Sequence, residues 1–243
     1  MTMAEKTSFM DIGYQKVDVN GNWRLSELFS ALTDVATTHA TELKLWDSNM
    51  FGTYGWIVSK MRIQILKPIR YEQKIAIKTW PGQGTRVIFP RYYEIRNEAD
   101  QVCVQAVGQW TLLDLVHRRI TSPQRVGLTF PEELNLNVPL MIETDFSEME
   151  DYQLIDQRQV KYSDIDTNGH LNNARYVELV LDILDYDRFK KDYIADFSIY
   201  FKKETAPGVI LNLELKEDGD RFWVRGTHAD QIHFLVEGQW QPH

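Results

Sequence analysis

Several features are scarce or missing in this sequence of 243 residues. Its one cysteine, Cys103, excludes an internal disulfide and a cysteine-based metal cluster. Residues 1–20 contain neither the apolar core of a signal peptide nor an Arg- and Ser-rich transit pattern. No run approaches the roughly 18 uninterrupted apolar residues that span a membrane. We therefore expect a chain without a membrane segment that works in the cytoplasm.

Positive charge is also in the minority. The formal net charge is −8, which argues against a general nucleic-acid-binding protein. The distribution is uneven, because between Ser48 and Tyr93 all charged residues except Glu72 are Lys or Arg. One interpretation is a set of solvent-facing strand residues that happen to be basic. The other is a docking face for an acidic partner.

The apolar content suits a folded protein. Hydrophobic residues make up 43% of the chain, which makes intrinsic disorder an unlikely class. At roughly 150 residues per domain, the length predicts one large domain or two small ones.

Two internal matches predict a tandem duplication. Residues 14–22 and 162–170 share the pattern Y-x-x-[VI]-D-x-N-G-[NH]. Residues 99–110 and 229–240 both begin A-D-Q-[VI] and end G-Q-W with the same spacing. Because both pairs occur in the same order, the second half is a copy of the first. The predicted units are an N-terminal domain over 1–125, a linker over 126–150 and a C-terminal domain over 151–243.

Each copy shows the same order of elements: one strand, one helix and four strands. Apolar residues recur at helical spacing from Leu25 to Leu43 and from Tyr176 to Leu184. The runs that follow are rich in β-branched and aromatic residues. This order predicts an α+β protein in which an antiparallel sheet packs on a helix in each unit. The expected strands after the helices are 56–66, 74–80, 87–96 and 102–115, then 197–203, 209–215, 221–227 and 232–240.

A polar cluster distinguishes the second copy. Asp166, Asn168 and His170 lie on a turn just before the second helix. Their two-residue spacing can direct all three to one side, where amides at a helix N-terminus can hold developing negative charge. Asn22 takes the place of His170 in the first copy. This difference favours a functional His170, whereas turn and cap chemistry explains the shared Asp and Asn more simply.

Other polar residues carry weaker signals. Asn172 or Asn173 can cap the second helix. Glu204 follows a predicted strand, where a glutamate is most often a solvated surface residue. Cys103 lies in a predicted strand and is expected in the core. The histidines show no metal-ligand spacing, so we predict neither a metal site nor a cofactor.

Residues 164–177 resemble the D-x-D-x-N-x-H-x-N-N-x-x-Y motif of the acyl-acyl carrier protein (acyl-ACP) thioesterases. Residues 56–62 are similar to that family's W-x-x-x-[RK]-M segment, and residues 75–80 and 109–122 also resemble it. The similarity covers roughly residues 8–240. It implies a tandem (double) hotdog fold: two long helices, each wrapped by an antiparallel sheet, with the two sheets joined edge to edge.

The resemblance also implies a reaction, the hydrolysis of a fatty acyl thioester on an acidic acyl carrier protein, which ends fatty acid synthesis. Asp166, Asn168, His170 and Glu204 match the family's catalytic residues. In this interpretation a buried Glu204 takes a proton from water and His170 places that water or protonates the thiolate. Asn168 and a helix amide polarise the carbonyl, and Asp166 orients its neighbours. Thr205 stands where plant members often carry cysteine, so water attacks without an acyl-enzyme.

The replacement of histidine in the first copy predicts one active site per chain and leaves the N-terminal half free to bind the acyl chain. The candidate substrate-binding residues are Trp56, Met61, Asn172 and Asn173. The candidate carrier-docking residues are Lys60, Arg62, Lys67, Arg118, Arg119 and Arg175.

Three alternatives remain open at this point: an acyl-CoA thioesterase, a dehydratase of 3-hydroxyacyl thioesters and a non-catalytic acyl-thioester sensor. The presence of both His170 and Glu204 weighs against pure binding. The sequence leaves the acyl chain length open, and the chain is expected to be a monomer or a homodimer.

Overall fold

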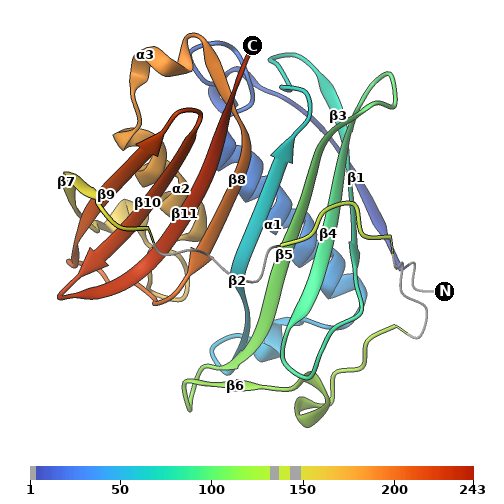
Figure 1. Cartoon of the computed structure of the whole chain (residues 1–243). Coiled ribbons are helices and arrows are strands. Elements are labelled where there is room, and N and C mark those ends of the chain that lie inside the picture. Colours follow the sequence, from blue (N-terminus) through green and yellow to red (C-terminus); the bar gives the residue numbers. More distant parts are fainter. Residues whose placement is uncertain (1–3, 132–136, 143–148) are drawn as a thin grey trace.

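The computed structural model describes residues 4–131, 137–142 and 149–243 (Figure 1). Within these ranges eleven strands form one antiparallel sheet, and the two longer helices lie on one face of it. The strand order is β1-β3-β4-β5-β2-β8-β11-β10-β9-β7, and β6 pairs with β5. The N-terminal half supplies the first five strands of this order, and the C-terminal half supplies the last five.

The N-terminal half is built around α1 (Leu25–Glu42), and three short 3-10 helices connect its elements. Its strands are β1 (Lys6–Asp11), β2 (Tyr54–Ile65), β3 (Lys74–Pro81), β4 (Phe89–Asn97), β5 (Val102–Asp114) and β6 (Arg119–Thr121). The 3-10 helices are η1 (Tyr14–Lys16), η2 (Ser48–Met50) and η3 (Pro123–Val126).

The C-terminal half repeats this plan around α2 (Asn173–Ile183), which is shorter than α1. Its strands are β7 (Gln153–Gln159), β8 (Asp192–Phe201), β9 (Ile210–Asp218), β10 (Arg221–His228) and β11 (Gln231–Pro242). The remaining elements are η4 (Tyr162–Asp164) and the one-turn helix α3 (Tyr186–Phe189). The predicted order of one strand, one helix and four strands is therefore present in both halves, with the short strand β6 added in the first half and the one-turn helix α3 in the second.

The two halves join through β2 and β8, which pair antiparallel with Lys60 opposite Tyr200 and Gln64 opposite Asp196. This confirms the expected edge-to-edge junction of a double hotdog. Arg62 on β2 and Asp196 on β8 form an ion pair of 2.7 Å across the junction. The junction removes the two free strand edges that separate sheets would expose.

The core lies between the sheet and the helices. Met61 and Ile63 alternate with polar neighbours along β2, so their side chains face the helices and are buried. The two helices contact each other over this surface. Cys103 is buried, as predicted. Burying a side chain such as Met61 or Ile63 stabilises the fold by about 1.5–3 kcal/mol.

Residues 137–142, which lie in the predicted linker 126–150, run across the face of the sheet opposite the helices (Figure 1). Two contacts fasten this stretch: Trp80 Nε1 donates to the Asn137 carbonyl at 2.9 Å, and Arg62 Nη1 donates to the Met141 carbonyl at 3.0 Å. The rest of the predicted linker includes 132–136 and 143–148, which lie outside the described residues. Across the described ranges, no helix has the length and apolar character needed to cross a bilayer.

Candidate active site

The loop that carries the predicted cluster is organised by Asp166. One carboxylate oxygen, Oδ1, accepts from the backbone N–H of Asn168 at 2.8 Å and of His170 at 3.3 Å. The Asp166 N–H donates to the His170 carbonyl at 2.9 Å and closes the loop. Gly169 has a φ of +81°, which glycine adopts without strain. Asp166 therefore positions Asn168 and His170 through their backbones.

The loop leads directly into α2. The Asn172 side chain accepts from the Ala174 N–H at 2.9 Å, so Asn172 rather than Asn173 is the N-cap. Leu171 N–H donates to the Thr205 carbonyl at 2.9 Å, which ties the loop to the segment after β8. This bond brings the loop beside Glu204, and His170 stands two residues before the cap.

Glu204 meets His170 across this junction. Its Oε2 lies 3.4 Å from His170 Nε2 and 2.5 Å from Nη2 of Arg118. The expected burial of Glu204 is wrong, because its side chain is 37% exposed. The reason is that β8 ends at Phe201, so Glu204 lies three residues beyond the strand in an exposed segment. The structure thus brings together Asp166, Asn168, His170 and Glu204, with Arg118 as an additional partner.

Thr205 points the other way, into the protein interior, and is fully buried. Its Oγ1 accepts from the Tyr176 hydroxyl at 2.8 Å and lies 2.7 Å from His233 Nδ1. Burial raises the pKa of Tyr176 to about 12, and burial lowers the pKa of His233. The Thr205 hydroxyl therefore belongs to a buried hydrogen-bonded network and does not face the loop with His170.

Matching backbone hydrogen bonds relate this site to its counterpart in the first half. Lys67 N–H donates to the Cys103 carbonyl just as Lys203 N–H donates to the His233 carbonyl. Because Lys67 matches Lys203, the next residue in the first half, Pro68, is the counterpart of Glu204. The counterpart of His170 is Asn22, which is buried. The first half therefore has asparagine and proline where the second half has His170 and Glu204.

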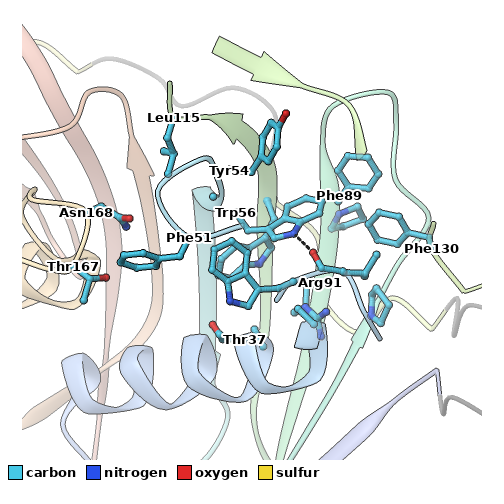
Figure 2. A pocket seen from close by; sticks show the side chains of 18 of the residues that line it. Thr37, Phe51, Tyr54, Trp56, Phe89, Arg91, Leu115, Phe130, Thr167 and Asn168 are labelled. Carbon is cyan, nitrogen blue, oxygen red and sulfur yellow. Dashed lines mark hydrogen bonds between the residues drawn. The ribbon is translucent and has the colours of Figure 1, made fainter. Parts of the chain in front are cut away.

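A cavity of about 260 Å³ lies between α1 and strands β2, β4 and β5 (Figure 2). Thr167 and Asn168, on the loop that also carries Asp166 and His170, line one side of it. The ring of Trp56 lies edge-on to Phe89 and Phe130, which stack at 4.8 Å. Most of the lining is apolar, including Ala36, Ala40, Trp56, Phe89, Leu115 and Phe130. The cavity is thus a mostly apolar space that is bordered by the loop with Asn168 and His170.

The side of the cavity away from Asn168 carries Arg91 (Figure 2). This arginine is 7% exposed, and its Nη1 lies 3.0 Å from His39 Nδ1 and 3.3 Å from Thr79 Oγ1. Burial lowers the pKa of the Arg91 guanidinium. The cavity is therefore mostly apolar, with Thr167 and Asn168 on one side and Arg91 on the other.

The predicted substrate-binding residues lie in different parts of the structure: the cavity, the core and the start of α2. Trp56 lines the cavity and donates from Nε1 to the Leu45 carbonyl at 2.9 Å. Met61 is buried in the core between sheet and helices. Asn172 is the α2 cap, and Asn173 is the first residue of that helix.

The predicted carrier-docking residues do not form one patch. Lys60 lies over the Tyr200 ring at 4.6 Å, and Arg62 pairs with Asp196, both at the junction of the halves. Lys67 lies beyond the far end of β2, where its Nζ donates to Gln101 Oε1 at 3.3 Å.

The other three docking candidates are closer to the site. Arg118 pairs with Glu204, and Arg119 follows it on β6 with its Nε 3.9 Å from Asp114 Oδ2. Arg175, in the first turn of α2, pairs with Glu178. Sequence reasoning missed both the Arg118–Glu204 pair and the Thr205 network. The exchange of Cys103 for His233 between the copies was the one signal that pointed to the network.

Comparisons with known proteins give a consistent result. The sequence model for the acyl-ACP thioesterase N-terminal domain matches residues 5–125, and the model for the C-terminal domain matches residues 147–242. An oleoyl-acyl carrier protein thioesterase of Coriandrum sativum is 23% identical over 78% of this chain and 56% of its own. An acyl-[acyl-carrier-protein] hydrolase of Cuphea viscosissima is 19% identical over 68% of this chain and 43% of its own. The chain spans about half the length of the curated relatives it matches.

Solved structures share the fold. An acyl-ACP thioesterase from Bacteroides thetaiotaomicron has a TM-score of 0.82 and 21% identity, covering 98% of both chains. A 12:0-ACP thioesterase from Umbellularia californica has a TM-score of 0.83 and 14% identity, covering 99% of this chain and 98% of its own. With two family models that together span nearly all of the sequence, and with the expected double hotdog fold, the chain belongs to the acyl-ACP thioesterase family.

Proposed function

We propose that this chain hydrolyses fatty acyl-ACP to free fatty acid and carrier protein. The observation that carries the proposal is the apolar cavity, which reaches the loop whose His170 lies 3.4 Å from Glu204. An acyl chain in this cavity would place its thioester carbonyl beside Asn168. Family membership supports the same reaction.

In the proposed mechanism Glu204 is the general base. It takes a proton from water, and the water oxygen attacks the thioester carbonyl carbon. The tetrahedral intermediate then collapses, the C–S bond breaks, and the sulfur leaves as a thiolate. Glu204 passes the proton to His170, with which it is in contact, and His170 gives a proton to that thiolate. The products are a carboxylic acid, which ionises in water, and the free thiol of the carrier.

Asn168 supplies the proposed hydrogen bond to the carbonyl oxygen. Its carboxamide lies at the edge of the cavity (Figure 2) and makes only a long contact of 3.5 Å with Asp166 Oδ2. A donor fixed before the reaction stabilises the oxyanion more than water would, because it does not need to reorient. The amide of Ala174 already donates to the Asn172 cap, so Asn168 is the better candidate.

We further propose that the acidic carrier protein docks beside this loop, where Arg119, Lys202 and Lys203 lie exposed near Glu204. Opposite charge at the rim of an interface mainly accelerates association. Arg62 is a weaker candidate because Asp196 already neutralises it. We place the reaction in the cytoplasm, as expected from the sequence, with a monomer or homodimer as the working form.

The test is thiol release from a panel of acyl-ACP thioesters and the matching acyl-CoAs. We expect carrier-dependent release by the wild-type chain and almost none by Glu204→Gln. Release from CoA thioesters alone would assign the chain to a different thioesterase class. Tight binding of acyl-ACP without release would mean that it is a sensor.

A further inference from the structure

One oxygen of Glu204 receives two partners from different halves of the molecule. Oε2 lies 3.4 Å from His170 Nε2 and 2.5 Å from Arg118 Nη2. His170 belongs to the C-terminal half, and Arg118 belongs to the β5–β6 connection of the N-terminal half. The half that lacks its own His–Glu pair therefore contributes a cation to the site of the other half.

The connection that carries Arg118 is held in a fixed shape by Asp114. Its Oδ1 accepts from the His117 N–H at 2.9 Å, and its Oδ2 lies 2.9 Å from His117 Nδ1. The backbone hydrogen bond from His117 lowers the pKa of Asp114, so its carboxylate stays charged. Arg118 itself has a φ of +49°, in the left-handed region that non-glycine residues seldom adopt.

The ion pair contributes little to stability, because the Arg118 side chain is 68% exposed and water screens exposed ion pairs. The left-handed backbone of Arg118 belongs to the turn that Asp114 holds, and Asp100 and Asp230 adopt the same conformation in the β4–β5 and β10–β11 connections. The contact of Arg118 with Glu204, and not the backbone of Arg118, is therefore the observation that points to a role in the site.

We propose that Arg118 is a positioning residue for the proposed hydrolysis, and the inference rests on that function. Arg118 holds the Glu204 carboxylate by Oε2, the oxygen that also faces His170. The other oxygen, Oε1, is then directed to the attacking water. This role places Arg118 within the site. Its neighbour in the sequence, Arg119, lies near Asp114 instead of Glu204.

The experiment compares Arg118→Gln and Arg118→Lys with Arg119→Gln, at a proposed docking residue, and with Arg70→Gln, at an exposed arginine between β2 and β3, as the control. Each is assayed on an acyl-ACP and on an acyl-pantetheine of the same chain length, which has no carrier protein. We expect Arg118→Gln to lower kcat by about 10²-fold on both substrates with little change in KM. Arg118→Lys keeps the charge and recovers part of this loss. Arg119→Gln changes the KM for acyl-ACP alone, and Arg70→Gln changes neither constant on either substrate.

A different pattern of changes in kcat and KM on the two substrates would overturn the inference. If Arg118→Gln equals wild type on acyl-pantetheine and raises KM only for acyl-ACP, Arg118 is a docking residue. If Arg118→Lys is no better than Arg118→Gln, a held carboxylate is not the explanation. A wild-type chain that releases thiol from neither substrate would refute the proposed hydrolysis itself, so the two failures are distinguishable.

Discussion

At the scale of single residues, Glu204 is the side chain on which the proposed chemistry depends most directly. Replacement by Gln keeps its shape and removes the base. We expect kcat to fall by about 10²–10⁴-fold, measured as thiol release at saturating acyl-ACP. Glu178→Gln is a suitable control, because it makes the same change of charge at a glutamate that pairs with Arg175 on α2. Near-normal turnover by Glu204→Gln would exclude it as the base.

Thr205 contributes to stability, because its hydroxyl satisfies two buried groups. Thr205→Val would leave the Tyr176 hydroxyl and His233 Nδ1 without this partner. We expect the free energy of unfolding to fall by about 1–3 kcal/mol, measured by urea denaturation. Thr205→Ser keeps the hydroxyl and is expected to lose much less. Equal losses in the two variants would mean that the methyl group matters more than the network.

His233 gives this network a pH dependence. Burial lowers its pKa from 6.5, so the folded chain favours the neutral ring. Below about pH 6.5 the unfolded chain binds more protons than the folded chain, and the free energy of unfolding therefore falls as the pH falls. Above that pH the contribution is fully present. Urea denaturation between about pH 8 and pH 5 measures the slope. We expect a shallower slope in His233→Gln but not in His228→Gln, and parallel slopes would contradict this.

At the scale of elements, Asn172 has two proposed roles, as the N-cap of α2 and as a substrate-binding residue, and two variants can distinguish them. Asn172→Ala removes the acceptor for the Ala174 N–H and is expected to cost about 1 kcal/mol. Asn172→Asp keeps an acceptor and is expected to retain the stability. Thermal denaturation and KM for acyl-ACP are measured on both. A raised KM in a stable Asn172→Asp variant would favour the predicted substrate contact over capping alone.

Most elements could be predicted from the sequence, because alternation and helical spacing reflect burial directly. The start of β8 was the main difference, since the sequence predicted it at Phe197 and the strand begins at Asp192. The pairing register with β11 shifts near Ala195, which indicates a β-bulge. A bulge interrupts the alternation of buried and exposed side chains, so the pattern becomes clear only after it. Helix α3 was missed because a single turn has no periodicity to detect.

The candidate site was predictable only in part. Asp166, Asn168 and His170 lie on one loop, so their spacing was informative, and Glu204 required the family resemblance. The position of Arg118 depends on how one half packs against the other. Arg118 and Glu204 are far apart in the sequence, and no sequence pattern indicates that they are close in space. A basic residue in a turn is most often solvated. The pairing of the two therefore required the structure.

At the scale of the whole molecule, the continuous sheet predicts cooperative unfolding. The junction between β2 and β8 spans five residue pairs, and the apolar faces of both halves meet in one core. We expect one transition when unfolding is followed by tryptophan fluorescence and by circular dichroism. Replacing Ile199 by Pro would remove a backbone hydrogen-bond donor of β8, the strand at the junction, and is expected to shift both signals together. Two separate transitions would mean that each half is stable alone.

The covalent link between the halves also affects how the enzyme responds to dilution. When a site is completed by two separate subunits, it is lost as they dissociate at low concentration. Here Arg118 and Glu204 lie on one polypeptide, so their meeting is intramolecular and their effective concentration is set by the chain. Dilution therefore does not separate Arg118 from Glu204. The duplicated chain keeps this contact in place at any protein concentration.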